Sequence, residues 1–303
     1  VQSLCLYSAV ARLPVALALL VFNSFPLMTA LWARLLYRHQ PERALLIAMP
    51  VILLGLVLAL DVLGAASGLG AAGQWREIGA GVGYALAASA TFGLAPFFTI
   101  SLLLAGFSSF EVLAYRWGIA SLTLVVFGIM LGETFRISRK DWGTVFILSL
   151  LRAATSFSLV IAYQNISSGV ASTIHFMYPL AVALAMMGFF GEKRSFAILF
   201  AVLVSLSGAG LLSSGKIDFE GGNTTIGLIA AGLSVFFYGG YIVGVRKSRA
   251  VQIPSTALTC YVMGLGALFF IIGGCLTGGI RLANDTHTWL NILGLALPAT
   301  AIS

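Results

Sequence analysis

Charged residues are scarce in this sequence. Asp, Glu, Lys and Arg together make up 9% of the 303 residues, whereas hydrophobic residues make up 59%. Ordinary soluble domains carry about a quarter charged residues, so this composition excludes a typical soluble domain. The formal net charge is +7. Because the basic residues stand in short segments between apolar blocks, we expect them to set membrane topology and predict no nucleic-acid partner.

Cysteine is scarce as well. Cys5, Cys260 and Cys275 lie in or beside apolar blocks, and none belongs to a CxxC pair. This pattern indicates neither a disulfide framework nor a metal site, and we interpret all three as small buried hydrophobic side chains. The sequence also lacks HExxH and GxSxG motifs and paired carboxylates in adjacent apolar blocks. It therefore predicts no enzyme and no cofactor.

Long apolar blocks are what the sequence does contain. A bilayer core needs about 20 apolar residues per helix, and roughly eleven blocks of about that length follow one another here. They predict an all-α polytopic membrane protein. Complete spans are expected at 15–37, 43–60, 80–105, 108–131, 143–165, 168–191, 196–214, 225–246 and 254–278, with partial spans at 1–13 and 288–303.

Part of the sequence is repeated. Placing Pro26 on Pro179 without gaps aligns eight further pairs of identical residues, and a weaker match places Gly83–Phe92 on Gly227–Phe236. Five predicted spans separate equivalent positions, and an odd number of spans reverses the orientation of the second copy. Such inverted repeats are typical of secondary transporters.

The positions of the basic loops give two different predictions of membrane topology. From residue 108 onward they alternate with loops poor in positive charge, which places Arg136–Lys140, Lys193–Arg194 and Arg246–Arg249 in the cytoplasm. The turn Arg38–Arg43 is also basic, but an odd number of spans separates it from Arg136. Either one half violates the rule, or the block at 80–105 does not cross once, or pieces of two related proteins join near Thr91–Pro96. We favour the last hypothesis, partly because both ends look truncated.

Several short stretches resemble EamA-type members of the drug/metabolite transporter superfamily. They are Gly93–Pro96, Ser108–Trp117, Tyr178–Leu180 leading to Gly191–Lys193, Gly208–Gly210 and, in the first segment, Phe25–Leu27. The resemblance implies inverted five-helix halves and carriage of amino acids or other small metabolites. By this resemblance, residues 1–93 are a partial segment similar to helices three to six, and residues 94–303 are similar to helices one to eight.

One arginine stands inside a predicted span. Arg152 lies about ten residues into its span, where a charge costs about 2.5–3.5 kcal/mol on insertion scales. Its guanidinium could hold a substrate carboxylate. Alternatively, it is a structural residue satisfied by backbone carbonyls, or it reaches toward the interface. Arg116 is nearer an interface, with Glu111 as its expected partner.

Other candidate substrate contacts surround a proline. His175 and Tyr178 are three residues apart and are expected on one helix face, and Pro179 frees a carbonyl one turn earlier. Tyr163 and Gln164 end the preceding span and could reach the same cavity. His175 could titrate near neutral pH or be a simple hydrogen-bonded core residue.

The remaining candidates lie in other spans. Tyr238 and Tyr241 are also three residues apart, and cavity lining and plain packing are both open for them. Pro26 is expected to kink the first segment as Pro179 kinks the second. No Asp or Glu lies deep in a predicted span, which disfavours a proton antiporter with a central carboxylate.

These observations predict a secondary transporter that moves a small polar or amphipathic metabolite by alternating access between inverted repeats. The alternative is a non-transporting membrane assembly subunit or an inactive recombined fragment. The expected partners are a small-molecule substrate and the lipid bilayer, and a homodimer is left open. We expect a multi-pass protein of a bacterial inner membrane.

Overall fold

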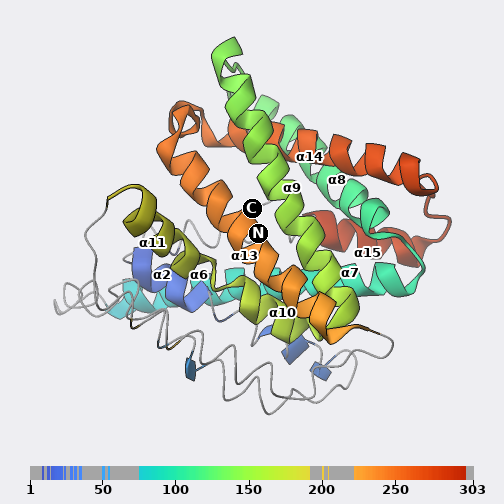
Figure 1. The fold of residues 1–303 in the computed structure, drawn as a ribbon, viewed down its shortest axis with the longest axis horizontal. Coiled ribbons are helices and arrows are strands. Elements are labelled where there is room, and N and C mark those ends of the chain that lie inside the picture. Colours follow the sequence, from blue (N-terminus) through green and yellow to red (C-terminus); the bar gives the residue numbers. More distant parts are fainter. Residues whose placement is uncertain are drawn as a thin grey trace.

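The computed structural model describes two long stretches of the chain, residues 75–191 and 222–297. It also describes a set of short pieces at 9, 12–13, 15–22, 24, 28–29, 31–32, 34–35, 50–51, 54, 200 and 204. Helices dominate these stretches (Figure 1). Their bounds are α2 (Val15–Phe22), α6 (Trp75–Gly93), α7 (Ala95–Leu104), α8 (Ser109–Met130), α9 (Trp142–Asn165), α10 (Ser168–His175), α11 (Tyr178–Phe189), α13 (Thr224–Lys247), α14 (Ser255–Thr277) and α15 (Thr286–Ala296).

Among the described residues, six helical segments are long and apolar enough to cross a membrane. They are Arg76–Leu104, Ser109–Met130, Arg139–Asn165, Ser168–Phe189, Thr224–Lys247 and Ser255–Thr277. The prediction of an all-α polytopic membrane protein is thereby confirmed. The predicted spans at 43–60 and 196–214 fall almost entirely outside the described residues, as do Pro26 and the turn Arg38–Arg43.

Two of the spans are broken in the middle. The span Arg76–Leu104 breaks at Leu94, and Ser168–Phe189 breaks between His175 and Tyr178. A proline stands in the first turn after each break, where its missing N–H is tolerated. The expectation that His175 and Tyr178 share one continuous helix is therefore wrong, because they end one helix and begin the next.

Glycine lets the central helices approach each other closely. Helix α8 packs along α14 and α9 along α13 (Figure 1). Gly266 of α14 lies directly against the ring of Trp117, so that an added Cβ would overlap it. At Gly244 of α13, a Cβ would lie 2.8 Å from a methyl carbon of Leu148. Such small-residue contacts stabilise helix pairs in lipid, where no hydrophobic force drives association.

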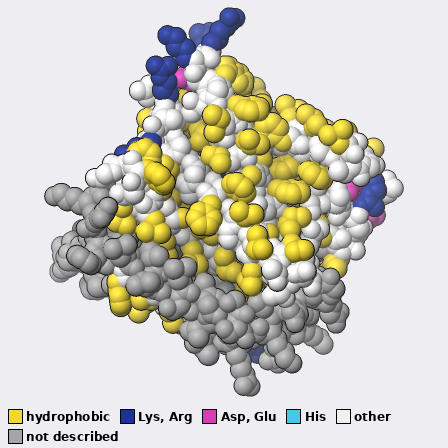
Figure 2. Space-filling model, in the orientation of Figure 1, with side chains coloured by type: hydrophobic (Ala, Val, Ile, Leu, Met, Phe, Trp, Pro, Cys, Tyr) yellow, Lys and Arg dark blue, Asp and Glu magenta, His cyan; other side chains and the backbone are white. Residues whose placement is uncertain are grey.

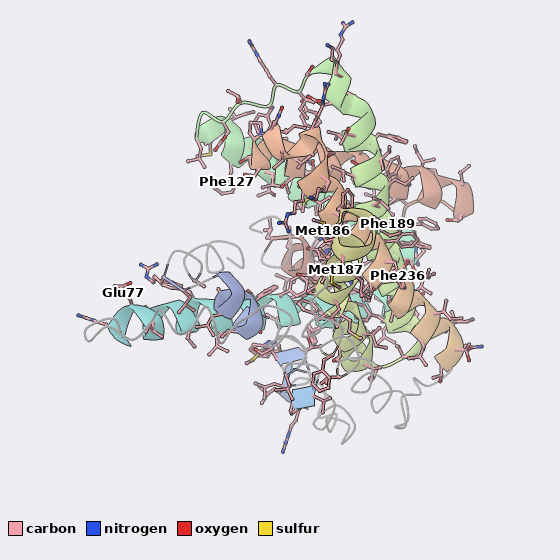
Figure 3. The ribbon with its side chains drawn as sticks, turned by 60° about the vertical axis from the view of Figure 1, so that its left-hand side comes forward. Glu77, Phe127, Met186, Met187, Phe189 and Phe236 are labelled. Carbon is pink, nitrogen blue, oxygen red and sulfur yellow. The ribbon has the colours of Figure 1, made fainter. Side chains whose placement is uncertain are left out.

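The outer surface of the helices is apolar. Hydrophobic side chains spread over the face in Figure 2, whereas Lys and Arg gather beyond the start of α9. Phe189 of α11 and Phe236 of α13 are among the exposed apolar side chains (Figure 3). In the same view α6, with α2 packed against it, extends away from the other helices, and Glu77 is near its far end. This surface fits contact with lipid rather than water.

The basic loops meet at one end of the helices. The loop after α8 is joined to the first part of α14, because the hydroxyl of Tyr261 donates to the carbonyl oxygen of Phe135 at 2.9 Å. Ala250 packs in the same cluster as Val145 and Leu148. We call this the basic end. It contains Arg136, Arg139, Lys140, Arg246, Lys247 and Arg249.

The opposite end carries little positive charge. There the backbone N–H of Asn223 donates to Oδ1 of Asn165 at 2.9 Å, which joins the end of α9 to the start of α13. The expectation that the loops at 136–140 and 246–249 share one side agrees with this arrangement. The loops expected on the other side include 165–169 and 216–223, and of the latter only residues 222–223 are described. We call this the outer end, since the positive-inside rule places the basic end in the cytoplasm.

An inverted repeat is visible in the contacts at the two ends. At the outer end the hydroxyl of Tyr115 in α8 donates to the carbonyl oxygen of Arg281 at 2.6 Å. The bond between Tyr261 in α14 and Phe135 repeats it at the basic end. The register is 146 positions in both cases, from 115 to 261 and from 135 to 281. Helix α14 is thus the inverted counterpart of α8.

Two further features repeat in nearly the same register. The same two tyrosines pack edge-on against Trp289 and Trp142, with ring centroids 6.0 and 5.2 Å apart. Gly132 follows α8 with φ of 72°, and Gly278, 146 positions later, follows α14 with φ of 137°. Glycine adopts positive φ more readily than other residues, so both helices are followed by a glycine in this conformation.

Candidate functional site

Arg152 lies near the middle of α9 and is surrounded by aromatic rings. Its guanidinium carbon is 5.0 Å from the ring centroid of Tyr238, 5.8 Å from that of Trp117 and 6.0 Å from that of Tyr241. These rings come from α8 and α13, so three spans meet at one charge. Within the described part of the chain, Arg152 makes no hydrogen bond and no ion pair. Its positive charge is held by ring faces alone.

The break between α10 and α11 lies against the same rings. The ring of Tyr178 is 4.5 Å from that of Tyr238 and nearly perpendicular to it, and the ring of His175 is 5.4 Å from it. Tyr238 and Tyr241 stack at 5.9 Å, as expected for residues on one helix face. We call these residues the central cluster: Trp117, Arg152, His175, Tyr178, Tyr238 and Tyr241.

His175 is held in a defined orientation. Its Nδ1 lies 2.9 Å from Oγ of Ser234, which donates its proton to the carbonyl oxygen of Ala231 at 2.6 Å. Because a hydroxyl has a single proton, Nδ1 of the imidazole must be the donor to Ser234. In the neutral ring, Nε2 is then a hydrogen-bond acceptor. The ring is 5% exposed, so this acceptor lies inside the protein.

The helix break also leaves backbone groups without their helical partners. Pro179 has no N–H, so the carbonyl oxygen of His175 lacks its usual donor one turn later. Non-helical backbone at membrane depth is tolerated where protein buries it or where it lines a polar cavity. The break therefore places polar backbone next to the central cluster, at the start of α11 where the helix dipole is positive.

The centre of the protein is electropositive. Arg116 lies in α8 and Arg152 in α9, both within candidate membrane spans. In the described ranges, the carboxylates stand near helix ends, at Glu77, Glu111, Glu133, Asp141 and Asp285. The same ranges hold no group of His, Cys, Asp and Glu suited to a metal ion. This arrangement favours binding of an anionic group.

Two predicted site residues lie elsewhere. The hydroxyl of Tyr163 is 3.1 Å from Oγ of Ser172, and its ring is packed in a cluster with the start of α10. Gln164 accepts a hydrogen bond from Ser109 at 3.3 Å, at the outer end. The expected pairing of Glu111 with Arg116 is wrong, because the carboxylate of Glu111 binds Arg281 instead.

Two members of the site were missed in the sequence. Trp117 was noted only as part of a family-like stretch, and nothing in the spacing of α8 points it toward Arg152. Ser234 could have been found, because it lies four and seven residues before Tyr238 and Tyr241 and therefore shares their helix face. Tyr238 and Tyr241 are its neighbours on that face.

Comparison with known proteins gives one match. Residues 79–214 match the model of the EamA-like transporter family, a family of transporters rather than enzymes. No curated protein and no solved structure matches the chain. The matched range includes α6 to α11 and five of the predicted spans, from 80–105 to 196–214. The resemblance predicted from the short motifs is confirmed, because residues 79–214 are similar to the EamA-like transporter family.

Proposed function

We propose that the chain is a secondary transporter that moves a small metabolite bearing a carboxylate or similar anionic group. The single observation that carries this proposal is Arg152, a mid-span guanidinium that has ring faces but no anion around it in the described residues. The ring faces offset its charge, but among the described residues no oxygen or nitrogen atom accepts a hydrogen bond from its N–H groups. A solute carboxylate would complete the site with two parallel hydrogen bonds.

Each remaining member of the central cluster takes a role in this proposal. Tyr238 and Tyr241 hold the guanidinium by their ring faces and leave its N–H groups directed at the solute. His175 offers Nε2 as an acceptor, which suits an ammonium or hydroxyl group on the same solute. Pro179 keeps the helix broken, so that backbone polar groups line the binding position.

Alternating access is supported by the inverted repeat. The contacts at Tyr115 and Tyr261 are equivalent and lie at opposite ends. Each repeat can therefore adopt the conformation of the other, which would close one end of the protein and open the other. Helices α8 and α14 pack face to face between these ends, which makes them the expected axis of rocking. A bacterial inner membrane and a small-molecule substrate are part of the proposal.

The test compares solutes with and without a carboxylate. Purified protein in proteoliposomes is assayed for uptake of the twenty amino acids and of the amines formed by their decarboxylation. We expect a preference for the carboxylates that is lost in Arg152→Ala and partly kept in Arg152→Lys. Arg139→Ala, at an exposed position of the basic end, is the matched control.

Two results would reject the role of Arg152. One is carboxylate uptake that is undiminished in Arg152→Ala. The other is equal loss in Arg139→Ala, which would indicate a general charge effect. Correct insertion is checked for each variant by a single symmetric peak in size-exclusion chromatography, so that loss of uptake is not confused with loss of fold.

A further inference from the structure

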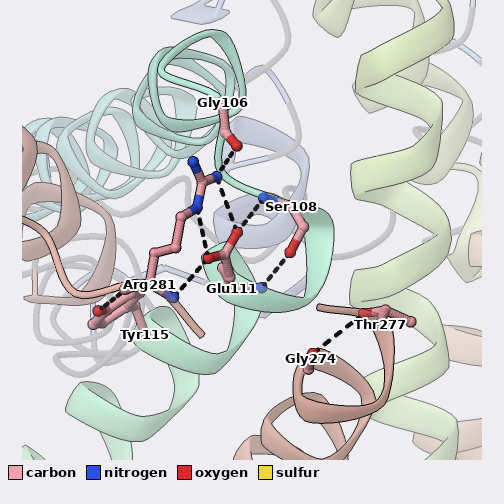
Figure 4. Close-up of polar contacts among 7 residues, drawn as sticks. All are labelled: Gly106, Ser108, Glu111, Tyr115, Gly274, Thr277 and Arg281. Carbon is pink, nitrogen blue, oxygen red and sulfur yellow. Dashed lines mark hydrogen bonds and ion pairs between the residues drawn. The ribbon is translucent and has the colours of Figure 1, made fainter. Parts of the chain in front are cut away.

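Two loops at the outer end are joined by a network of polar contacts. One loop connects α7 to α8, and the other connects α14 to α15 (Figure 4). The first loop lies within the family-matched segment. The second loop follows α14, the inverted counterpart of α8. We call the joining residues the clasp: Gly106, Ser108, Glu111, Tyr115 and Arg281.

Glu111 is the buried half of the clasp. Glu111 is 3% exposed, and both of its carboxylate oxygens accept hydrogen bonds. Oε1 accepts from the backbone N–H of Arg281 at 2.8 Å and from Nε of the same residue at 3.1 Å. Oε2 accepts from the backbone N–H of Ser108 at 2.6 Å and from Nη2 of Arg281 at 3.3 Å.

Arg281 is the accessible half. Its side chain is 56% exposed, and it stands on a loop. Nη2 also donates to the carbonyl oxygen of Gly106, and the guanidinium lies 5.1 Å from the ring centroid of Phe107. Tyr115 donates to its carbonyl oxygen. Arg281 can therefore leave Glu111 and be hydrated, whereas Glu111 itself has little access to water.

Among the described residues, the basic end has no equivalent ion pair. In the 146-position register, Ala257 replaces Glu111 and Phe135 replaces Arg281. The tyrosine-to-carbonyl bond is kept there, but the surrounding contacts are apolar and include Val145, Ala250 and Leu258. The backbone contact is thus common to both ends, while the charged contact occurs at the outer end alone in the described residues.

We propose that Glu111 and Arg281 form a latch that holds the outer end closed, and that opening toward the outside requires this pair to separate. The inference rests on the proposed transport by alternating access. The two charges belong to different repeats, so rocking that opens the outer end pulls them apart. Because separation leaves a buried carboxylate without its partner, the latch favours the outward-closed state at rest.

A buried serine beside the clasp can report on opening. Ser109 is 8% exposed and binds Gln164 of α9, so it lies where the outer end would part. Ser109→Cys is introduced into protein whose native cysteines are replaced by serine. Its labelling by a membrane-impermeant maleimide is timed from the outer side, in sealed vesicles without added solute.

The variants separate charge from packing. Glu111→Gln removes the negative charge and keeps the side-chain size. Arg281→Gln removes the positive charge and shortens the side chain, and Arg281→Lys restores the charge. Glu133→Gln changes an exposed carboxylate outside the clasp and is the matched control. We expect the two neutral variants to label about tenfold faster than the parent, the lysine variant to fall near the parent rate, and the control to be unchanged.

Equal labelling rates in the parent, Glu111→Gln and Arg281→Gln would overturn the latch, as would the same acceleration in Glu133→Gln. Should Glu111→Gln not fold, the comparison of Arg281→Gln with Arg281→Lys decides alone, because Arg281 stands on an exposed loop. A second measurement repeats the labelling with each transported amino acid. If solutes change no labelling rate in any variant, the proposed transport fails, whereas a failed latch leaves uptake intact.

Discussion

At the scale of single residues, Arg152 shows how a charge can be kept in a membrane span without a counter-charge. Its burial costs about 2.5–3.5 kcal/mol, and each desolvated cation–π contact returns about 0.5–2 kcal/mol. Three rings lie within 6.0 Å of the guanidinium carbon, so the two amounts are comparable. The rings therefore make the guanidinium tolerable within the span, and among the described residues no acceptor occupies its N–H groups.

The orientation of His175 gives a prediction at the same scale. Ser234→Ala removes the acceptor that holds Nδ1 of His175, so the ring is no longer fixed in one orientation. Loss of one such hydrogen bond is worth about 1.4 kcal/mol, or a tenfold weaker apparent affinity for the solute. The measurement is the solute concentration at half-maximal uptake.

Ser149→Ala is the control for this change. Ser149 is equally buried and also donates to a carbonyl of its own helix, that of Val145, but it lies toward the basic end. We expect its half-saturating concentration to stay at the parent value. Equal shifts in both variants would show that the effect comes from a lost helix contact rather than from His175.

At the scale of elements, the unbroken spans were predictable and the breaks were not. The bounds of α8, α9, α13 and α14 fall within two residues of those expected, because an apolar run itself defines where a span begins and ends. Leu94 and the residues between His175 and Tyr178 are as apolar as their neighbours. Only Pro96 and Pro179 marked the positions, and a proline alone predicts a kink as readily as a break.

The candidate site was predictable in part for a related reason. Arg152, His175 and Tyr178 stand out because they are polar groups inside apolar spans. Tyr163 and Gln164 are polar in the same way, but the rotation of α9 directs them to other neighbours, and rotation depends on packing against distant helices. The clasp joins residues 111 and 281, which are 170 positions apart, and no local pattern relates them.

The contact between α8 and α14 gives a prediction at the element scale. Gly266→Ala places a methyl group in overlap with the ring of Trp117, which is 2% exposed and cannot move freely. Overpacking of this kind costs about 1–3 kcal/mol, so we expect a lower melting temperature in detergent.

Gly232→Ala in α13 is the matched control, because nothing lies within 4 Å of its added Cβ. We expect it to be neutral or slightly stabilising, since alanine favours a helix over glycine by up to about 1 kcal/mol. A melting temperature that falls equally in both variants would show that helix propensity in lipid, rather than the contact with Trp117, explains the result.

At the scale of the whole molecule, the two ends differ in charge and share a backbone design. This gives a topology prediction. Single cysteines at Lys140 and Arg249 are expected to react with an impermeant maleimide from the cytoplasmic side, and those at Asn223 and Thr286 from the outside. The same reagent applied to both faces of sealed vesicles makes the measurement.

A cysteine at Arg43, outside the described residues, extends the map to the first segment. Labelling on the side opposite to Lys140 fits one continuous fold. Labelling on the same side as Lys140 supports the prediction that residues 1–93 and 94–303 are joined pieces of related transporters. Labelling of Lys140 and Arg249 on opposite sides would contradict the fold itself, because their loops pack together at the basic end.

The rings around Arg152 also bear on how the chain is assembled during synthesis. Trp117 precedes α9, but Tyr238 and Tyr241 belong to α13 and leave the ribosome at least 86 residues after Arg152, counting from 152 to 238. Until then, α9 enters the bilayer with its charge largely unshielded. We therefore expect the position of α9 in lipid to become stable only after α13 has been inserted.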